Sequence, residues 1–179
     1  MKTIVLGITG GIAAYKAADI ANELTKAGIA VDAIMTENAQ KFISPLTIQT
    51  LTKRKVYTGM FESYVPSEVE HISLAKRADL VLVAPATANI LAKAACGIAD
   101  DMLSTVLLAV PDRRKIVFCP AMNTEMYAHP ATKGNIEILM GYGCRFIEPR
   151  EGLLACGDVS RGALEKTEII VEKTLELLR

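Results

Sequence analysis

The 179-residue sequence lacks an excess of charge of either sign, because twenty lysines and arginines balance twenty aspartates and glutamates. It also lacks any long block of like charge. Without a positive surface field, little attracts nucleic acid or anionic lipid, so neither is expected as a partner.

An apolar stretch long enough to cross a bilayer, about 20 residues, is also missing. The most apolar run, residues 80–91, is interrupted by Pro85 and Asn89. The apolar residues 4–14 have a single basic residue, Lys2, before them and continue into an amphipathic pattern. A secretory signal instead has a more positively charged start and ends at a cleavage site. We therefore expect a cytoplasmic protein without a membrane partner.

Internal repeats and proline- or serine-rich stretches are absent, so the composition marks no linker. A chain of this length with 51% hydrophobic residues can bury one sizeable core. We therefore expect a single domain over residues 1–179.

Closely spaced metal ligands are missing too. The cysteines at positions 96, 119, 144 and 156 form no CxxC pair, and His71 and His129 show no ligand spacing to them. Structural zinc sites need such spacing, so no metal is expected. His129 is interpreted as structural.

The four cysteines differ in their surroundings. Cys96, Cys119 and Cys144 fall within or beside apolar segments, which predicts packing roles. Cys156 instead lies in a non-periodic loop, residues 149–162, whose glycines can act as hinges. A chemical role is predicted for Cys156 alone.

Short apolar segments rich in β-branched residues alternate with amphipathic ones. Residues 3–8 predict a buried strand, residues 12–27 a helix and residues 29–35 the next strand. Further strands are predicted at residues 80–84, 115–119 and 145–147, and helices at residues 88–96, 102–108, 132–140 and 164–178. The alternation predicts a three-layer, doubly wound parallel α/β sheet of the Rossmann or flavodoxin type.

In such sheets, ligands bind outside the carboxyl ends of the strands. Gly10 and Gly11 follow the first strand, where backbone N–H groups can face a phosphate. The surrounding GITGG differs from the GxGxxG fingerprint, so a glycine turn that tightens packing is equally compatible. Asn123 follows a later strand and by itself indicates a helix cap, as does the segment 85–89. His71 alone indicates a surface or capping residue.

Five segments together resemble the homo-oligomeric flavin-containing cysteine decarboxylase family. They are GGIAAYK at residues 10–16, His71-Ile-x-Leu74, PATAN at residues 85–89, PAMNTEM at residues 120–126 and ACGD at residues 155–158. The resemblance covers essentially the whole chain. The cysteine in ACGD points to members that act in coenzyme A synthesis, since members that decarboxylate a peptide's C-terminal cysteine lack it.

The resemblance implies a binding site for flavin mononucleotide (FMN), formed by Gly10, Gly11, Ile12, Thr36, Thr87, Ala88, Asn89, Ile90 and Ala121. It implies three catalytic residues, with Asn123 binding the substrate carboxylate, His71 beside it and Cys156 supplying a proton. The implied reaction converts 4'-phosphopantothenoyl-cysteine to 4'-phosphopantetheine. The family first oxidises the thiol carbon to a thioaldehyde, which accepts the electron pair left by carbon dioxide. The members that act in coenzyme A synthesis then reduce the resulting enethiol. A free thiol has a pKa of about 8.5, so Cys156 suits a proton donor.

The sequence departs from the family pattern in two places. Tyr127 stands where a Trp or Phe is usual, and the ACGDxGxGR pattern has Ser160 for its second glycine and Ala163 for its arginine. If that arginine helps to hold the substrate phosphate in the family, Arg161 is the nearby residue that can substitute for it.

The family also implies partners. It builds flavin sites between the subunits of a trimer, sometimes stacked into larger shells, so a homo-oligomer is expected. Many relatives are fused to the preceding ligase, and this chain ends after Leu178, so a separate ligase is expected to supply the substrate. A peptide-cysteine decarboxylase and a flavin-binding regulatory subunit are the alternatives; Cys156 argues against the first, and the lack of long acidic extensions against the second.

Overall fold

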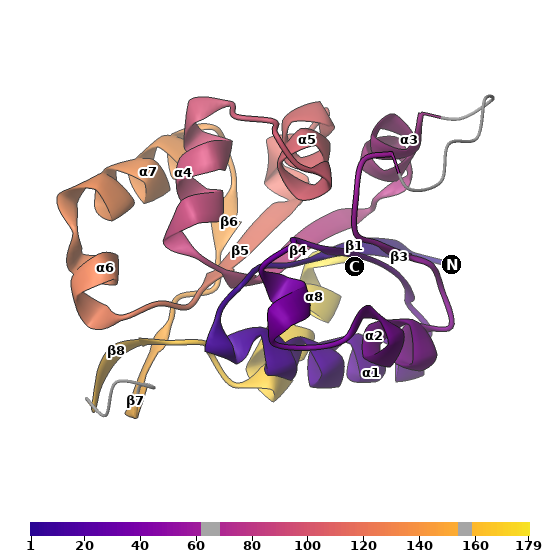
Figure 1. Ribbon diagram of the computed structural model, residues 1–179, viewed down its shortest axis with the longest axis horizontal. Helices are drawn as coiled ribbons and strands as arrows, with labels where there is room; N and C mark the ends of the chain where they lie inside the picture. The colour runs from indigo at the N-terminus through magenta and orange to yellow at the C-terminus, as the bar shows by residue number, and fades with distance from the viewer. Residues whose placement is uncertain (62–68, 154–158) are drawn as a thin grey trace.

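A six-stranded parallel sheet forms the middle layer of the computed structural model, which describes residues 1–61, 69–153 and 159–179 (Figure 1). The strands lie in the order β3-β2-β1-β4-β5-β6. Their bounds are β1 (Thr3–Ile8), β2 (Ala30–Met35), β3 (Val56–Tyr57), β4 (Leu80–Ala86), β5 (Ile116–Pro120) and β6 (Arg145–Phe146). This is the Rossmann strand order, with its switch point between β1 and β4, and it confirms the predicted fold class.

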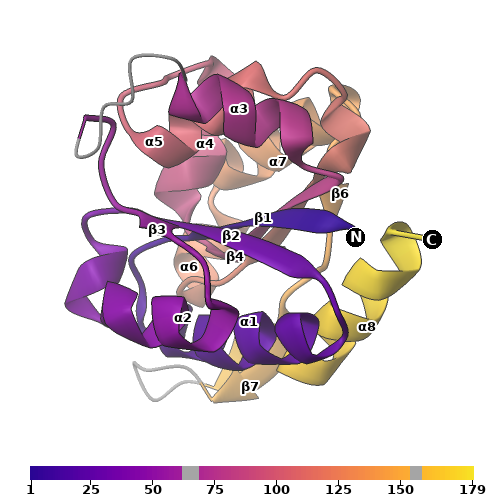
Figure 2. The ribbon, with the colours of Figure 1, turned by 90° about the vertical axis from the view of Figure 1, so that its right-hand side faces the viewer.

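Helices cover both faces of the sheet, which explains why its strands are almost wholly apolar (Figures 1 and 2). Along β1, Ile4, Leu6 and Ile8 pack in one core cluster and Val5 packs in the other, as the two-residue period of a strand requires. The first cluster lies under α1 (Ala17–Lys26), α2 (Pro45–Thr52) and α8 (Thr167–Leu177). The second lies under α3 (Glu70–Arg77), α4 (Ala88–Cys96), α5 (Met102–Ala109) and α7 (Pro130–Gly141).

The pairing register brings the carboxyl ends of the central strands to one edge. β1 pairs with β2 from Thr3 and Ala30 to Ile8 and Met35. β1 also pairs in parallel with β4, and this pairing extends as far as Gly7. The loops after β1, β2, β4 and β5 therefore open on the same side of the sheet, where ligands bind in this fold.

The helices differ from the predicted ranges at their ends. The segment predicted as a helix over residues 12–27 begins as a 3₁₀ turn, η1 (Ile12–Lys16), as the N-termini of helices often do. The last helix begins at Thr167, later than predicted, because a strand that ends at Ala163 comes shortly before it. None of the described helices is long and apolar enough to cross a membrane.

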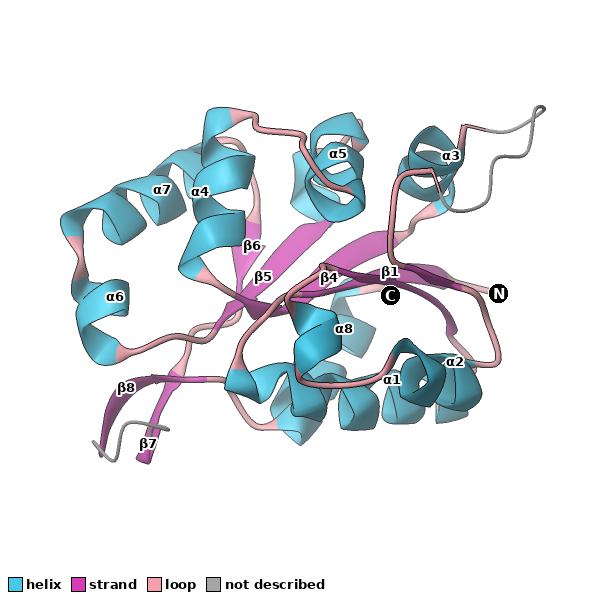
Figure 3. Ribbon diagram, viewed as in Figure 1, coloured by secondary structure: helices cyan, strands magenta, loops and turns pink. Residues whose placement is uncertain are grey.

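The loop predicted over residues 149–162 is mainly an antiparallel hairpin of β7 (Arg150–Leu153) and β8 (Val159–Ala163) (Figure 3). The prediction was wrong because these short strands contain glycines and no clear alternation of apolar residues. Cys156 falls between them in sequence and lies outside the described residues. The sequence also gave no prediction for α2, α3, β3 or the short helix α6 (Thr124–Ala128).

Candidate active site

The loops after β1 and β4 are joined by Thr9, a residue that the sequence patterns did not single out. Its side chain is only 2% exposed. The hydroxyl donates to the carbonyl oxygen of Pro85 at 2.7 Å and accepts from the backbone N–H of Thr87 at 3.1 Å. These loops flank the switch point, so Thr9 fixes their separation at the ligand crevice. The sequence signal that could have identified Thr9 is its position as a polar residue directly after a buried strand.

The two glycines after β1 have different surroundings. A Cβ atom on Gly10 would lie 2.3 Å from the Cβ of Asn38 and 2.7 Å from its carbonyl carbon. A Cβ atom on Gly11 would meet only Cγ2 of Thr87, at 3.8 Å. Gly10 therefore lets the loops after β1 and β2 pack closely, whereas Gly11 leaves space beside Thr87 in which a ligand can lie.

We expect Gly10→Ala to lower the stability of the flavin-free protein by about 1–3 kcal/mol, because the added methyl group must displace the Asn38 backbone. Gly11→Ala is the matched control, since its extended backbone and open surroundings accept a methyl group. It should leave the flavin-free Tm unchanged while lowering the amount of bound flavin. Thermal unfolding and flavin absorbance measure both effects, and equal loss of Tm in the two variants contradicts this assignment.

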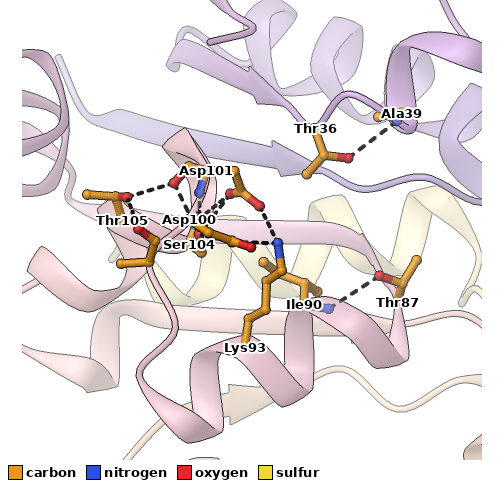
Figure 4. Close-up of polar contacts among 10 residues, drawn as sticks. Thr36, Ala39, Thr87, Ile90, Lys93, Asp100, Asp101, Ser104 and Thr105 are labelled. Carbon is orange, nitrogen blue, oxygen red and sulfur yellow. Dashed lines mark hydrogen bonds and ion pairs between the residues drawn. The ribbon is translucent and has the colours of Figure 1, made fainter. Parts of the chain in front are cut away.

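Thr36 and Thr87, both predicted to contact the cofactor, cap the turns that follow them (Figure 4). The Thr36 hydroxyl oxygen accepts from the N–H of Ala39 at 3.3 Å, and that of Thr87 accepts from the N–H of Ile90 at 3.4 Å. Both threonines are half-buried at the crevice. Thr87 is the N-cap of α4, so the first N–H groups of that helix point toward the crevice, as phosphate binding requires.

The remaining predicted cofactor residues after β4 and β5 differ in exposure. Asn89 is exposed, Ala88 and Ala121 are half-buried, and Ile90 is 1% exposed in the core. Ile90 can therefore offer a ligand little more than its backbone. The N–H of Ala121 donates to the carbonyl of Ala86 at 3.0 Å, so the β4–β5 pairing continues into the crevice loops.

Several apolar side chains on the segments after β1 and β2 are exposed. Ile12, predicted to contact the cofactor, is 59% exposed, and Tyr15, Phe42 and Leu46 are also exposed. Exposed apolar surface is typical of binding sites for a ligand or another protein. The predicted cofactor site therefore borders an apolar surface, which we call the crevice rim.

Asn123 follows β5 and is the N-cap of α6. Its Oδ1 atom accepts a hydrogen bond from the N–H of Glu125 at 2.8 Å, which confirms the capping interpretation. Because the side-chain oxygen bonds the helix, the group suited to a substrate carboxylate is the Nδ2 amide, which is a donor.

The hairpin strand β8 lies against the segment that carries Asn123. The N–H of Met122 donates to the carbonyl oxygen of Gly162 at 3.0 Å. A Cβ atom on Gly162 would lie 2.3 Å from the Met122 carbonyl oxygen, and its φ of +148° also favours glycine. Gly162 therefore permits the close contact that holds the hairpin next to Asn123.

A second contact attaches the hairpin to α6. The Tyr127 hydroxyl donates to the carboxylate of Glu148, which also accepts from Arg161 at 3.3 Å. Burial and the Glu148 carboxylate raise the pKa of Tyr127 to about 12, so its hydroxyl remains a donor at neutral pH. Tyr127 therefore makes a hydrogen bond that a Phe at this position could not make, and Arg161 pairs with a carboxylate of its own chain.

His71 is half-buried near the start of α3. Ion pairs hold both ends of this helix against the sheet edge: Lys55 pairs with Glu70 at its start, and Arg77 donates to buried Asp32 at 2.9 Å at its end. These two ion pairs connect the helix that carries His71 to the segments of β2 and β3. They therefore help to define the position of His71 relative to those strands.

The structure does not bring His71 beside Asn123 within one chain. Figure 1 places α3 and α6 at opposite ends of the molecule, and Figure 2 shows α3 in front with α6 behind the sheet. The cause is the strand order, since α3 precedes β4 and packs on α5, whereas α6 follows β5 farther along the sheet. The described chain therefore places the predicted cofactor residues and Asn123 on segments that follow the carboxyl ends of β1, β2, β4 and β5, whereas His71 lies on α3.

Two of the three cysteines predicted to pack are buried. Burial raises the pKa of the Cys119 thiol, and it raises the pKa of Cys144 to about 11, so both are inert thiols. The packing prediction for Cys96 was wrong, because α4 ends there and exposes it. Cys96 and Cys144 line a cavity of about 440 Å³ between α4, α5 and α7, which includes none of the predicted site residues.

Comparison with known sequences identifies relatives over the whole chain. A family model described as Flavoprotein matches residues 1–179. A "Probable phosphopantothenoylcysteine decarboxylase" from Streptococcus mutans serotype c is 48% identical over 177 residues, covering 99% of this chain and 99% of that protein. The "Coenzyme A biosynthesis bifunctional protein CoaBC" of Bacillus subtilis is 51% identical over 171 residues, covering 96% of this chain. The chain spans only 42% of that bifunctional protein.

Solved structures with the same fold include a PPC decarboxylase, a cysteine-to-serine mutant complexed with pantothenoylaminoethenethiol. It is 28% identical with a TM-score of 0.87, covering 98% of this chain and 97% of that one. The FMN-dependent cysteine decarboxylase SpaF is 28% identical with a TM-score of 0.84, covering 100% of this chain and 98% of that one. Both similarities extend over nearly the whole chain, so they include every loop of the crevice.

Proposed function

Since this chain belongs to the Flavoprotein family, we propose that it is an FMN-dependent phosphopantothenoylcysteine decarboxylase that converts 4'-phosphopantothenoyl-cysteine to 4'-phosphopantetheine. The observation that carries this proposal is the 48% identity, over the full length of both chains, to a relative named for that activity. The bifunctional relatives are named for coenzyme A biosynthesis, and the same pathway is proposed here.

The loops after β1, β2 and β4 have features that suit FMN. The open space at Gly11 and the N–H groups at the start of α4, which Thr87 caps, suit a phosphate, and the apolar crevice rim suits a flat aromatic ring. We propose that the nine predicted cofactor residues hold it, with Ile90 contributing through its backbone. When bound, FMN supplies the two-electron oxidation of the thiol-bearing carbon and the later reduction.

The residues of the chain then position the substrate and move protons. The Asn123 amide orients the carboxylate with neutral hydrogen bonds, which hold it without the ion pair that opposes loss of carbon dioxide. Cys156 supplies a proton when the enethiol is reduced. Asn123 and the hairpin are joined through Met122 and Gly162, so the carboxylate site and the strands on either side of Cys156 form one unit.

A neighbouring copy of the chain supplies His71 to each site in this proposal. The support is the separation of α3 from α6 within one chain and the exposed crevice rim, which a second copy can cover. We therefore propose a homo-oligomer with ring symmetry, as a trimer or a larger shell built from trimers.

Residues 1–179 act as one domain in this proposal, and the protein works in the cytoplasm, where coenzyme A precursors are handled. The bifunctional coenzyme A biosynthesis relatives suggest that a ligase reaction supplies the substrate.

Incubation of the purified protein with 4'-phosphopantothenoyl-cysteine tests the proposal. We expect a yellow protein whose released cofactor is FMN, carbon dioxide release, and an equal amount of 4'-phosphopantetheine. A peptide ending in cysteine is the comparison substrate and should react far more slowly. No carbon dioxide from the small substrate excludes the proposed activity, and faster reaction of the peptide favours the peptide-cysteine alternative.

A further inference from the structure

Arg150 begins β7 and lies directly opposite Ala163 of β8. Its guanidinium extends along the hairpin over Gly152, because a Cβ atom on Gly152 would lie 2.6 Å from Nη1 and 3.2 Å from Cζ of Arg150. The same Cβ atom would lie 3.5 Å from the Cβ of Ala163. The guanidinium, Gly152 and Ala163 therefore share one face of the hairpin, and the missing side chain of Gly152 makes room for the arginine.

This guanidinium lacks a counter-ion among the described residues. Its Nη1 donates to the carbonyl of Glu151 at 3.0 Å, but its Nε is buried without a hydrogen-bond partner in that part of the chain. No described carboxylate forms an ion pair with it, whereas Arg161 on the same hairpin pairs with Glu148. Arginine stays charged at every physiological pH, and a buried donor without a partner is costly. Such a group is suited to an anion that arrives from outside the chain.

Arg150 also lies next to the proposed substrate site. Its cross-strand partner Ala163 follows Gly162, which contacts Met122, the neighbour of Asn123. Ala163 occupies the position of the arginine in the ACGDxGxGR pattern. Directly opposed residues of an antiparallel pair have their Cβ atoms only about 5 Å apart. An arginine at 150 can therefore place its guanidinium in the region that an arginine at 163 would reach.

We propose that Arg150 binds the phosphate group of the substrate, and that Gly152 provides the space for its guanidinium. The planar guanidinium can donate two parallel hydrogen bonds to phosphate oxygens. The proposal rests on the proposed function, which supplies the phosphorylated substrate. It assigns the phosphate to Arg150 and leaves Arg161 as the anchor of the hairpin to Glu148 and Tyr127.

Binding of 4'-phosphopantetheine and of unphosphorylated pantetheine to the flavin-loaded protein, measured by calorimetry, tests the proposal. Arg150→Met should weaken binding of the phosphorylated compound by about 10- to 100-fold, the usual effect of losing a charge-assisted hydrogen-bond pair. Binding of pantetheine should stay unchanged. Arg150→Lys should lose part of the affinity, and Gly152→Ala should lose part of it by displacing the guanidinium.

Arg161→Met is the matched control, because it removes a hairpin arginine that already has a carboxylate partner. It should change the affinities for the two compounds by the same factor. Equal weakening of both compounds in Arg150→Met, or no weakening, overturns the proposal. Turnover of 4'-phosphopantothenoyl-cysteine by the unmutated protein tests the proposed function separately, since the binding comparison does not depend on catalysis.

Discussion

Cys156→Ser is expected to release carbon dioxide from 4'-phosphopantothenoyl-cysteine while forming at least about 100-fold less 4'-phosphopantetheine, a loss typical of removing a general acid. A thiol, with a pKa of about 8.5, gives up a proton far more readily than an aliphatic hydroxyl. The reaction should therefore stop at the enethiol.

Mass spectrometry of the products together with carbon dioxide measurement separates the two halves of the reaction. Cys96→Ser is the control, because Cys96 is exposed at the end of α4 and lies outside the crevice. It should form both products at the unmutated rate. Normal 4'-phosphopantetheine formation by Cys156→Ser rejects the proton-donor role.

Asn123→Asp should lower the rate of carbon dioxide release by about 100- to 1,000-fold, comparable with the loss of a positioned catalytic hydrogen-bond donor. The new carboxylate repels the substrate carboxylate and cannot donate the hydrogen bond of the amide. Asp caps helices as well as Asn does, so the bond to the N–H of Glu125 should persist. The Tm and the FMN content should therefore remain near those of the unmutated protein.

Asn123→Ala separates the two roles of this residue. It removes both the amide and the cap of α6, and loss of an N-cap costs about 0.5–2 kcal/mol of stability. We expect a lower Tm and a loss of activity in Asn123→Ala, but only a loss of activity in Asn123→Asp. An active Asn123→Asp variant shows that the carboxylate is bound elsewhere.

Most of the central sheet could be predicted because its strands are local apolar runs that carry their own pattern. β1, β2, β4 and β5 each lie within or close to the predicted ranges. β3 and β6 have only two residues each, and β7 and β8 are short and glycine-containing, so periodicity is a weak signal there. β6 was nevertheless predicted, whereas β3 and the hairpin were not.

The candidate site was less accessible to sequence reasoning. Taken singly, Asn123 predicted a cap, which the structure confirms, and His71 indicated only a surface or capping residue. Their proposed chemistry depends on the family resemblance, which rests on five sequence segments taken together. Thr9 and Arg150 were not singled out, because the importance of each comes from a partner that is distant in sequence or on the facing strand.

The sequence by itself determined the alternation of strands and helices, the loops that follow the strands and the family, because these depend on local periodicity and on motifs of a few residues. The tertiary structure alone decided that Thr9 joins two loops 76 residues apart in sequence, that Arg150 faces Ala163, and that α3 lies far from α6. Such contacts depend on the path of the whole chain. Strand order and hairpin register bring together residues that are distant in sequence, and the local sequence around one of them does not predict the other.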